Sequence, residues 1–308
     1  KTLDLLADIE LDLGRIHFRR SAVQDAHDRF ASAEAAFTQL YGPTHPVTLD
    51  ARHNKGSMLV AQGKVDEGLE VLGQALEGRE RTLGPQHEAV ARTINSIASA
   101  HYGKGDYAKA LEFYERAVAI HRAAHEGGHV LVADTLANTA RCLSKLGRHD
   151  EAEGRFRESA DILEAKLGAE HPRLAEALGG WASAMVKAER FEQALALHKR
   201  VIEMRRKALG PTAPRTLIGE YNAAEVERGL NQRRSAKARI QRILAAENRW
   251  PLIRVHAHVL QGWILVDEGK YAAARASFEA AIAEEPAAGE DANLKQAVDK
   301  ARKWMDEH

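Results

Sequence analysis

Residues 87–125 read HEAVARTINSIASAHYGKGDYAKALEFYERAVAIHRAAH, which is the pattern of two amphipathic helices joined by a turn. The first half carries one stripe with the i, i+3, i+4, i+7 spacing of a helical face: Ile94, Ile97, Ala98 and His101. Gly105 and Asp106 interrupt the helix. The second half carries a facing stripe: Tyr107, Ala110, Leu111, Tyr114, Ala117 and Val118. The small residues predict that the two helices pack closely as a hairpin.

This pattern recurs along the chain with a period of 42 residues. One column of the repeat is histidine: His45, His87, His129 and His171. A second is glycine, three residues earlier: Gly42, Gly84, Gly168 and Gly210. Other columns are small (Ala26, Ala110, Ala152, Ala194, Ala236) or bulky (Phe30, Leu72, Tyr114, Phe156). Self-similarity at one fixed period indicates a helical repeat array.

The columns resemble the tetratricopeptide repeat (TPR). The last unit shows the resemblance best, through Gly262, Leu265, Gly269, Tyr271, Ala274, Phe278, Ala281 and Pro286. The earlier units are longer than the 34-residue repeat of that family. Their junction reads Leu-Gly-x-x-His-Pro at residues 167–172, which is similar to the kinesin-light-chain type of repeat, a form also common in bacterial signalling proteins. In the sixth unit Glu227 replaces a bulky residue and Asn231 replaces the turn glycine, so we expect looser packing there.

The resemblance implies an all-α, right-handed TPR superhelix, or α-solenoid, that forms one domain over residues 1–308. We expect seven helix pairs, at 1–42, 43–84, 85–126, 127–168, 169–210, 211–250 and 251–287. Residues 289–306 carry an apolar stripe and are expected to form a capping helix, because a repeat array must cover its last apolar face.

Composition excludes several classes of protein. The 308 residues hold 44 Lys and Arg against 44 Asp and Glu, so the chain lacks the net positive charge of a general nucleic-acid or anionic-membrane binder. No apolar run is long enough to span a membrane. The single cysteine, Cys142, excludes an internal disulfide and favours the cytoplasm. Because the chain begins at Lys1, we expect it to be a fragment of a larger protein.

Residues 125–129, His-Glu-Gly-Gly-His, match the His-Glu-x-x-His string of zinc proteases. That chemistry needs a continuous helix, which two glycines disfavour. The string also lies at a repeat junction, where the repeat itself requires His129, and the junction histidines are expected to act as helix caps. Cys142 is expected to be a small buried side chain rather than a nucleophile. We therefore expect no enzyme activity, no metal and no cofactor.

The stretch from Lys199 to Arg254 is basic, with 14 Lys and Arg against 5 Asp and Glu. A functional interpretation is a patch that binds an acidic peptide, another domain or nucleic acid. The alternative is a solvated helix surface that keeps the array soluble. Consecutive basic residues such as Arg233 and Arg234 point around the helix, which favours the alternative.

In the family the first helix of each pair lines a groove that binds peptides or helices. Asparagine suits this surface because its amide both donates and accepts hydrogen bonds with a peptide backbone. Asn54, Asn138 and Asn222 share one groove position at a spacing of 84 residues. The remaining predicted groove residues are Arg92, Asn95, Tyr102, Arg141, Lys145, Lys187, Tyr221 and Arg228. Asparagine here could also bond neighbouring helices, and the basic side chains favour a ligand with carboxylates.

The sequence therefore predicts a non-catalytic, cytoplasmic scaffold or sensor of a bacterial signalling or effector protein. Its expected partner is a protein or peptide, with acidic residues favoured by the basic groove, or another domain of the same full-length protein. We expect neither a membrane nor nucleic acid as partner. The alternative is a regulatory module of a nucleic-acid-linked, transcriptional or defence protein that uses the basic 199–254 region.

Overall fold

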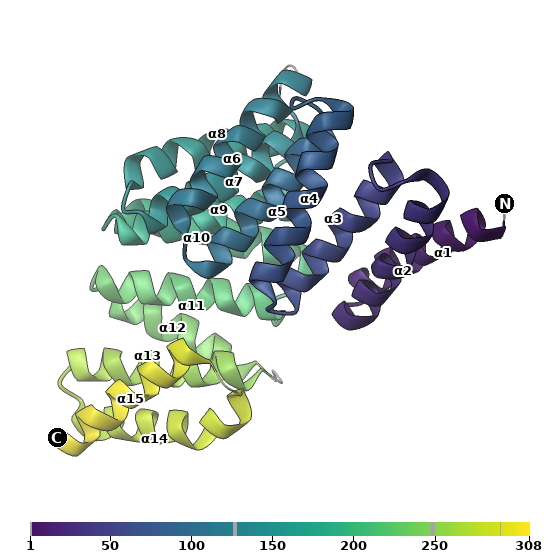
Figure 1. Cartoon of the computed structure of the whole chain (residues 1–308). Coiled ribbons are helices and arrows are strands. Elements are labelled where there is room, and N and C mark those ends of the chain that lie inside the picture. The colour runs from purple at the N-terminus through teal and green to yellow at the C-terminus, as the bar shows by residue number, and fades with distance from the viewer. Residues whose placement is uncertain (1, 126–127, 247–249, 290) are drawn as a thin grey trace. The chain divides into compact units, whose positions relative to one another are not determined.

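A computed structural model describes residues 2–125, 128–246, 250–289 and 291–308 (Figure 1). These residues form fifteen α-helices and no strand, which confirms the all-α prediction. The helices are α1 (Thr2–Arg19), α2 (Val23–Tyr41), α3 (Pro46–Ala61), α4 (Val65–Leu83), α5 (Glu88–Lys104), α6 (Tyr107–Ala124), α7 (Val130–Lys145), α8 (His149–Leu167), α9 (Pro172–Lys187), α10 (Phe191–Leu209), α11 (Pro214–Gly229), α12 (Arg233–Ala245), α13 (Pro251–Asp267), α14 (Tyr271–Ala288) and α15 (Ala292–Glu307). None of the helices in these ranges is both long and apolar enough to cross a membrane.

The chain divides into two compact units, Lys1–Ile162 and Leu163–His308, and the boundary falls within α8. Unit 1 contains the hairpins α1–α2, α3–α4 and α5–α6, followed by α7 and most of α8. Unit 2 contains α9–α10, α11–α12 and α13–α14, followed by α15. In both units, helices that follow each other along the chain pack side by side. The expectation of one continuous domain over residues 1–308 stays a prediction.

The repeated small and bulky residues form the interior of each hairpin. In unit 1 the bulky column is buried throughout, at Phe30, Leu72, Tyr114 and Phe156. The first helix presents a small residue opposite it: Gly14, Gly56, Ala98 and Ala140. A Cβ added to Gly14 would lie 2.6 Å from the Phe30 ring. The two helices can therefore approach closely only where the first one carries a small side chain.

Each hairpin turns at one residue in the left-handed region. Four of these residues are glycine, at Gly63, Gly105, Gly147 and Gly269, with φ between 72° and 85°. The equivalent Ser21, Glu189 and Asn231 adopt φ near 60° without being glycine. This conformation is unfavourable for a residue with a Cβ, and asparagine tolerates it best. The loss of the turn glycine in the sixth pair therefore leaves the turn itself unchanged.

The junction histidines begin the first helices as expected, with one exception. The side chains of His87, His129 and His171 accept hydrogen bonds from backbone N–H groups two residues later, at 3.1–3.2 Å. These bonds satisfy donors that a helix N-terminus leaves open. His45 occupies the same position but makes no such bond to a described residue; its ring lies 4.7 Å from that of Tyr41.

Unit 2 departs from the period at its second hairpin. Helices α9 and α11 begin 42 residues apart, at Pro172 and Pro214, whereas α13 begins at Pro251, only 37 residues after α11. The missing residues come from α12, which has 13 residues where α10 has 19. After this hairpin α13, α14 and α15 pack together, and α15 buries Leu294, Val298 and Ala301. Helix α15 is therefore the predicted capping helix.

Candidate functional site

The predicted groove residues of unit 1 lie on one side of its first helices. On α5, Tyr102 follows Asn95 by seven residues, which is close to two helical turns. We call this surface the first-helix face of unit 1, defined by Asn54, Arg92, Asn95, Tyr102, Asn138, Arg141 and Lys145. The arginines and Lys145 are exposed, whereas the three asparagines are half-buried. The face thus presents charge at its surface and amides at its base.

Asn95 joins three helices at the base of this face. Its Nδ2 donates to Thr135 Oγ1 of α7 at 3.2 Å and lies 3.5 Å from His121 Nε2 of α6. Its Oδ1 is buried and has no hydrogen-bond partner among the described residues. Asn95 therefore bonds neighbouring helices, one of the two roles expected of it, and retains one acceptor.

A hollow of about 210 Å³ lies between α3 and α5 beside Asn95. Its polar lining consists of the amide of Asn95 and three hydroxyls, from Ser57, Ser96 and Ser99. Its apolar lining is Val60 of α3, with the fully buried Leu72 of α4 behind it. A hollow of this composition can take an apolar side chain of a ligand while its rim bonds the ligand backbone.

A buried arginine, Arg79, pairs with Asp50 beside the first-helix face of unit 1. Arg79 of α4 is 1 % exposed, and its guanidinium donates to the backbone oxygen of Ala89 at 2.9 Å and to Asp50 of α3. Burial lowers the pKa of Arg79, whereas Asp50 opposes that shift. Asp50 also lies 3.5 Å from Arg92. The carboxylate is thus shared between two arginines, and the basic character expected at Arg92 is partly neutralised.

Burial and two neighbouring arginines keep His53 neutral. Burial, together with the positive charges of Arg79 and Arg92, lowers the pKa of His53 to about 3. Its Nδ1 is buried and lacks a hydrogen-bond partner in the described part of the chain. His53 therefore adds no positive charge to the first-helix face.

Aromatic and basic residues meet where α5 and α7 end. The rings of Tyr102 and Tyr107 are 5.2 Å apart in an edge-to-face arrangement. Lys145 Nζ lies 5.6 Å from the centre of the Tyr107 ring, within the range of a cation–π contact. Arg141 donates to Asn138 Oδ1 at 2.8 Å. The structure thus brings Tyr102, Lys145 and the Asn138–Arg141 pair onto the end of this face.

The four predicted residues of unit 2 have different surroundings. Lys187 is exposed at the end of α9, whereas Tyr221 and Asn222 are half-buried on α11. The Tyr221 ring lies 5.4 Å from that of His256 on α13, and burial raises the pKa of Tyr221. Arg228 makes a bidentate ion pair with Asp267, in which Nε donates to Oδ2 at 2.6 Å and Nη2 to Oδ1 at 3.2 Å. Arg228 is therefore bonded within the unit.

The basic stretch 199–254 is neutralised by carboxylates from helices outside it. Six of its basic residues pair with acidic residues that lie before or after the stretch: Arg200 with Glu164, Lys207 with Glu170, Arg215 with Glu176, Arg228 with Asp267, Lys237 with Glu268, and Arg254 with Glu284. The excess of positive charge in the sequence is thus largely absent from the folded surface, because neighbouring helices supply the opposite charge.

The other residues considered for chemistry are the His125–His129 string and Cys142. His125 follows the end of α6 and His129 precedes α7, so the two do not share a helix; Glu126 and Gly127 lie outside the described residues. Among the described residues, no group of three or more His, Cys, Asp or Glu side chains could hold a metal ion. Cys142 is fully buried, and burial raises the pKa of its thiol to about 12. The prediction of a small buried side chain at Cys142 is confirmed.

Sequence reasoning missed two features of the first-helix face of unit 1. The serines of the hollow carry no signal of their own, although Ser57, Ser99 and Arg141 share one position of the 42-residue period. Arg79 also escaped attention, because a charged residue on a second helix is normally taken as exposed. The period again held a clue, since Arg205 of unit 2 is equivalent and donates to the backbone oxygen of Arg215.

Comparison with known proteins shows the family. Two family models, both described as tetratricopeptide repeat, match the chain, one at residues 48–123, 90–165 and 173–247 and the other at 221–292. Together these matches cover well over half of the chain. The chain belongs to the tetratricopeptide repeat family.

Solved structures show the same fold at low sequence identity. A tetratricopeptide repeat protein from Parabacteroides merdae has a TM-score of 0.63 and 17 % identity, over 97 % of this chain and 99 % of that one. Repeats described as those of a kinesin light chain from Podosopora anserina have a TM-score of 0.57 and 23 % identity, over 65 % of this chain and 95 % of that one. PilF of Pseudomonas aeruginosa has a TM-score of 0.56 and 14 % identity, over 79 % of this chain and 93 % of that one.

Proposed function

We propose that this chain is a non-catalytic protein-interaction module that binds a peptide segment along the first-helix face of unit 1. The observation that carries the proposal is the hollow between α3 and α5, with three hydroxyls and the Asn95 amide around an apolar lining. Asn54 and Asn138 lie half-buried on the helices at either side of α5. Membership of a family whose repeats generally serve as interaction scaffolds supports the same role.

The expected ligand is an extended segment with an apolar side chain and a nearby carboxylate. The apolar side chain would enter the hollow against Val60 and Leu72. The carboxylate would meet the exposed guanidinium of Arg141, since charge-assisted bonds to arginine are strong and directional. Arg92 is the weaker candidate for this contact, because Asp50 already lies 3.5 Å from it.

Peptide display tests this proposal. Random peptides selected on the wild-type chain should bind it, and binding should weaken at least about 10-fold in the double variant Asn138→Ala, Arg141→Glu, because both the amide and the cation are lost. Fluorescence polarisation of labelled peptides measures the change. Lys109→Gln, an exposed substitution on α6, is the matched control. Selected peptides that bind wild type and the double variant equally would contradict the proposed face.

We further infer that the module recruits or senses a partner within a bacterial signalling or effector protein of the cytoplasm. This finer statement rests on the kinesin-light-chain type of junction at residues 167–172. Expressing the intact gene product and identifying proteins crosslinked through a photoreactive residue at Ser96 would test it. Partners without any part in signalling, or crosslinks unchanged by the double variant, would contradict it.

The alternative role in a nucleic-acid-linked protein has less support. A duplex requires several cations that follow its backbone. In the basic stretch the ion pairs with Glu164, Glu170 and Glu176 already occupy three of the basic side chains. The geometry therefore favours a protein ligand.

A further inference from the structure

The shortened helix α12 borders a second hollow, of about 800 Å³, on the side of unit 2 formed by its second helices. Helices α10, α11 and α12, the Pro211–Thr212 loop and Ala246, which follows α12, surround it. In a full-length repeat, α12 would continue beyond Ala245 as α10 does to Leu209. The hollow therefore lies beside the point where the second helix of the sixth repeat ends early.

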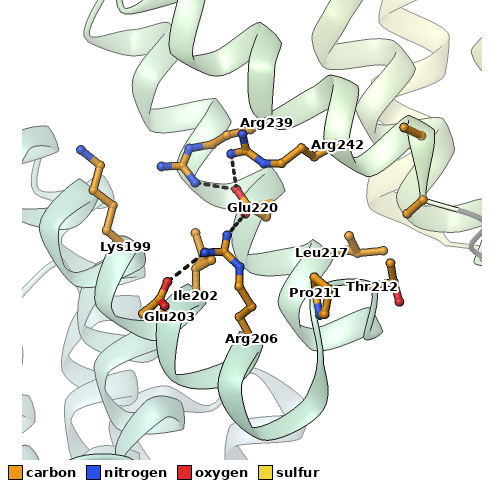
Figure 2. A pocket seen from close by; sticks show the side chains of 12 residues that line it. Lys199, Ile202, Glu203, Arg206, Pro211, Thr212, Leu217, Glu220, Arg239 and Arg242 are labelled. Carbon is orange, nitrogen blue, oxygen red and sulfur yellow. Dashed lines mark hydrogen bonds and ion pairs between the residues drawn. The ribbon is translucent and has the colours of Figure 1, made fainter.

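A buried carboxylate organises the base of this hollow (Figure 2). Glu220 of α11 is 3 % exposed and accepts hydrogen bonds from three arginines. Arg206 reaches it from α10 at 2.9 Å, and Arg239 and Arg242 reach it from α12. Burial would raise the pKa of Glu220, but the bonds from Arg239 and Arg242 outweigh burial and lower it. Glu220 is therefore ionised and holds three guanidinium groups at fixed places.

Arg239 has a second buried partner. Its Nε donates to Oε2 of Glu227 at 2.9 Å, and the Glu227 side chain is fully buried. Glu227 is the residue that replaces a bulky side chain of the repeat, so the shortened hairpin exchanges an apolar contact for an ion pair. The Arg239 side chain, bonded to both carboxylates, is only 10 % exposed, whereas Arg206 and Arg242 keep 39 % and 53 % of their side chains exposed toward solvent.

The hollow has an excess of about one positive charge. Lys199 and the three arginines supply four positive charges, while Glu203, Glu220 and Glu227 supply three negative ones. An arginine carries five N–H donors, and among the described residues Arg242 forms one hydrogen bond, to the carboxylate of Glu220. The outer donors of Arg206 and Arg242 thus remain for an incoming anion. Ile202 and Leu217, each 2 % exposed, form the apolar wall behind them.

We propose that this hollow is a second binding site, distinct from the first-helix face of unit 1, for a protein segment that presents one carboxylate next to an apolar side chain. The carboxylate bonds the outer N–H groups of Arg206 and Arg242, and the apolar side chain lies against Ile202 and Leu217. A single carboxylate balances the local charge. A phosphate dianion would exceed it and would lie beside Glu203 and Glu220, which favours the carboxylate.

Titration of the full chain with two matched dipeptides tests the site by NMR. N-acetyl-Leu-Glu-amide should shift the methyl signals of Ile202 and Leu217 and the Nε–H signals of Arg206 and Arg242, with a dissociation constant of about 1 mM. N-acetyl-Leu-Gln-amide, which is neutral, should bind about 10-fold more weakly, because the charge-assisted bonds are lost. Arg242→Gln should weaken binding of the acidic dipeptide by a similar factor. Arg234→Gln, an exposed substitution on the same helix, is the control.

Several results would overturn this inference. They are the absence of a saturable shift at Ile202 and Leu217, equal binding of the two dipeptides, and an equal loss in Arg242→Gln and Arg234→Gln. Inorganic phosphate that saturates the same signals at lower concentration than the acidic dipeptide would assign the hollow to phosphate instead. Because the readout is local to unit 2, failure here leaves the proposal for unit 1 unaffected, and the reverse also holds.

Discussion

Asp50 and Arg79 form an ion pair beside Arg92 of the first-helix face, with 34 % and 1 % of their side chains exposed. Removing one partner of a buried pair leaves the other charge without compensation. We expect Asp50→Ala to lower the free energy of unfolding by about 2 kcal/mol, measured by urea titration. The matched control is Asp66→Ala, whose carboxylate is 85 % exposed in its pair with Lys104 and whose loss should leave the urea midpoint unchanged. Equal effects of both substitutions would contradict this account of Arg79.

His198 occupies the bulky column of the fifth hairpin, where Phe30, Phe156 and Phe278 stand in other hairpins, and it is 3 % exposed. Burial lowers its pKa from 6.5 to about 4. As the pH falls below 6.5, the unfolded chain therefore takes up the proton before the folded chain does, and stability is lost down to about pH 4.

His198→Phe removes this titration and suits the column. Between pH 7.5 and pH 4.5 the variant should gain about 2.5 kcal/mol of stability relative to wild type, because two pKa units of His protonation no longer favour the unfolded state. Urea unfolding at both pH values measures the difference. A stability difference between variant and wild type that is the same at both pH values would show that His198 is protonated in the folded state.

At the level of residues, the sequence predicts which residues cap the helices better than it predicts which side chains bond one another. The 42-residue period predicts the caps at His87, His129 and His171, because position in the repeat determines them. It does not predict that Asn95 bonds Thr135, since two residues 40 apart meet only once two hairpins have packed. At His45, which makes no cap bond to a described residue, the ring lies 4.7 Å from that of Tyr41, four residues earlier in the chain.

Gly262 and Gly154 both lie inside helices, but only Gly262 is packed tightly against a neighbouring side chain. A Cβ on Gly262 of α13 would lie 2.2 Å from Phe278, whereas a Cβ on Gly154 of α8 would meet nothing within 4 Å. Gly262→Ala should therefore destabilise the chain by about 1–3 kcal/mol through overpacking. Gly154→Ala should stabilise it by about 1 kcal/mol, because alanine favours the helix. Thermal unfolding followed by circular dichroism compares them, and a destabilising Gly154→Ala would contradict this prediction.

At the level of helices, the repeat predicts nearly everything except α12. The hairpins, their turns and the capping helix follow from columns of small and bulky residues. The sequence shows that the sixth unit is irregular at Glu227 and Asn231, but not which helix is shortened. The ion pairs of Glu220 and Glu227 with Arg239 form only where α11 packs against α12, so they belong to the folded hairpin and not to either helix alone.

Carboxylates elsewhere in unit 2 pair with basic residues of the stretch 199–254. Because carboxylates of neighbouring helices pair with the basic stretch 199–254, we expect no duplex DNA or RNA binding that falls steeply with salt. Electrophoretic mobility shift at low and moderate salt measures this, with Arg200→Gln and Lys207→Gln as variants that should change nothing. A retarded band at low salt that is weakened by either variant would revive the alternative of a nucleic-acid-linked function.

The central claim is that the first-helix face of unit 1 binds a peptide. The most direct measurement is an NMR titration of the wild-type chain with a display-selected peptide, observing the side-chain amides of Asn54, Asn95 and Asn138. The account predicts saturable shifts of these amides and of the Leu72 methyl groups, and their loss in Asn138→Ala, Arg141→Glu. Saturable binding that leaves all three amides unshifted would contradict it.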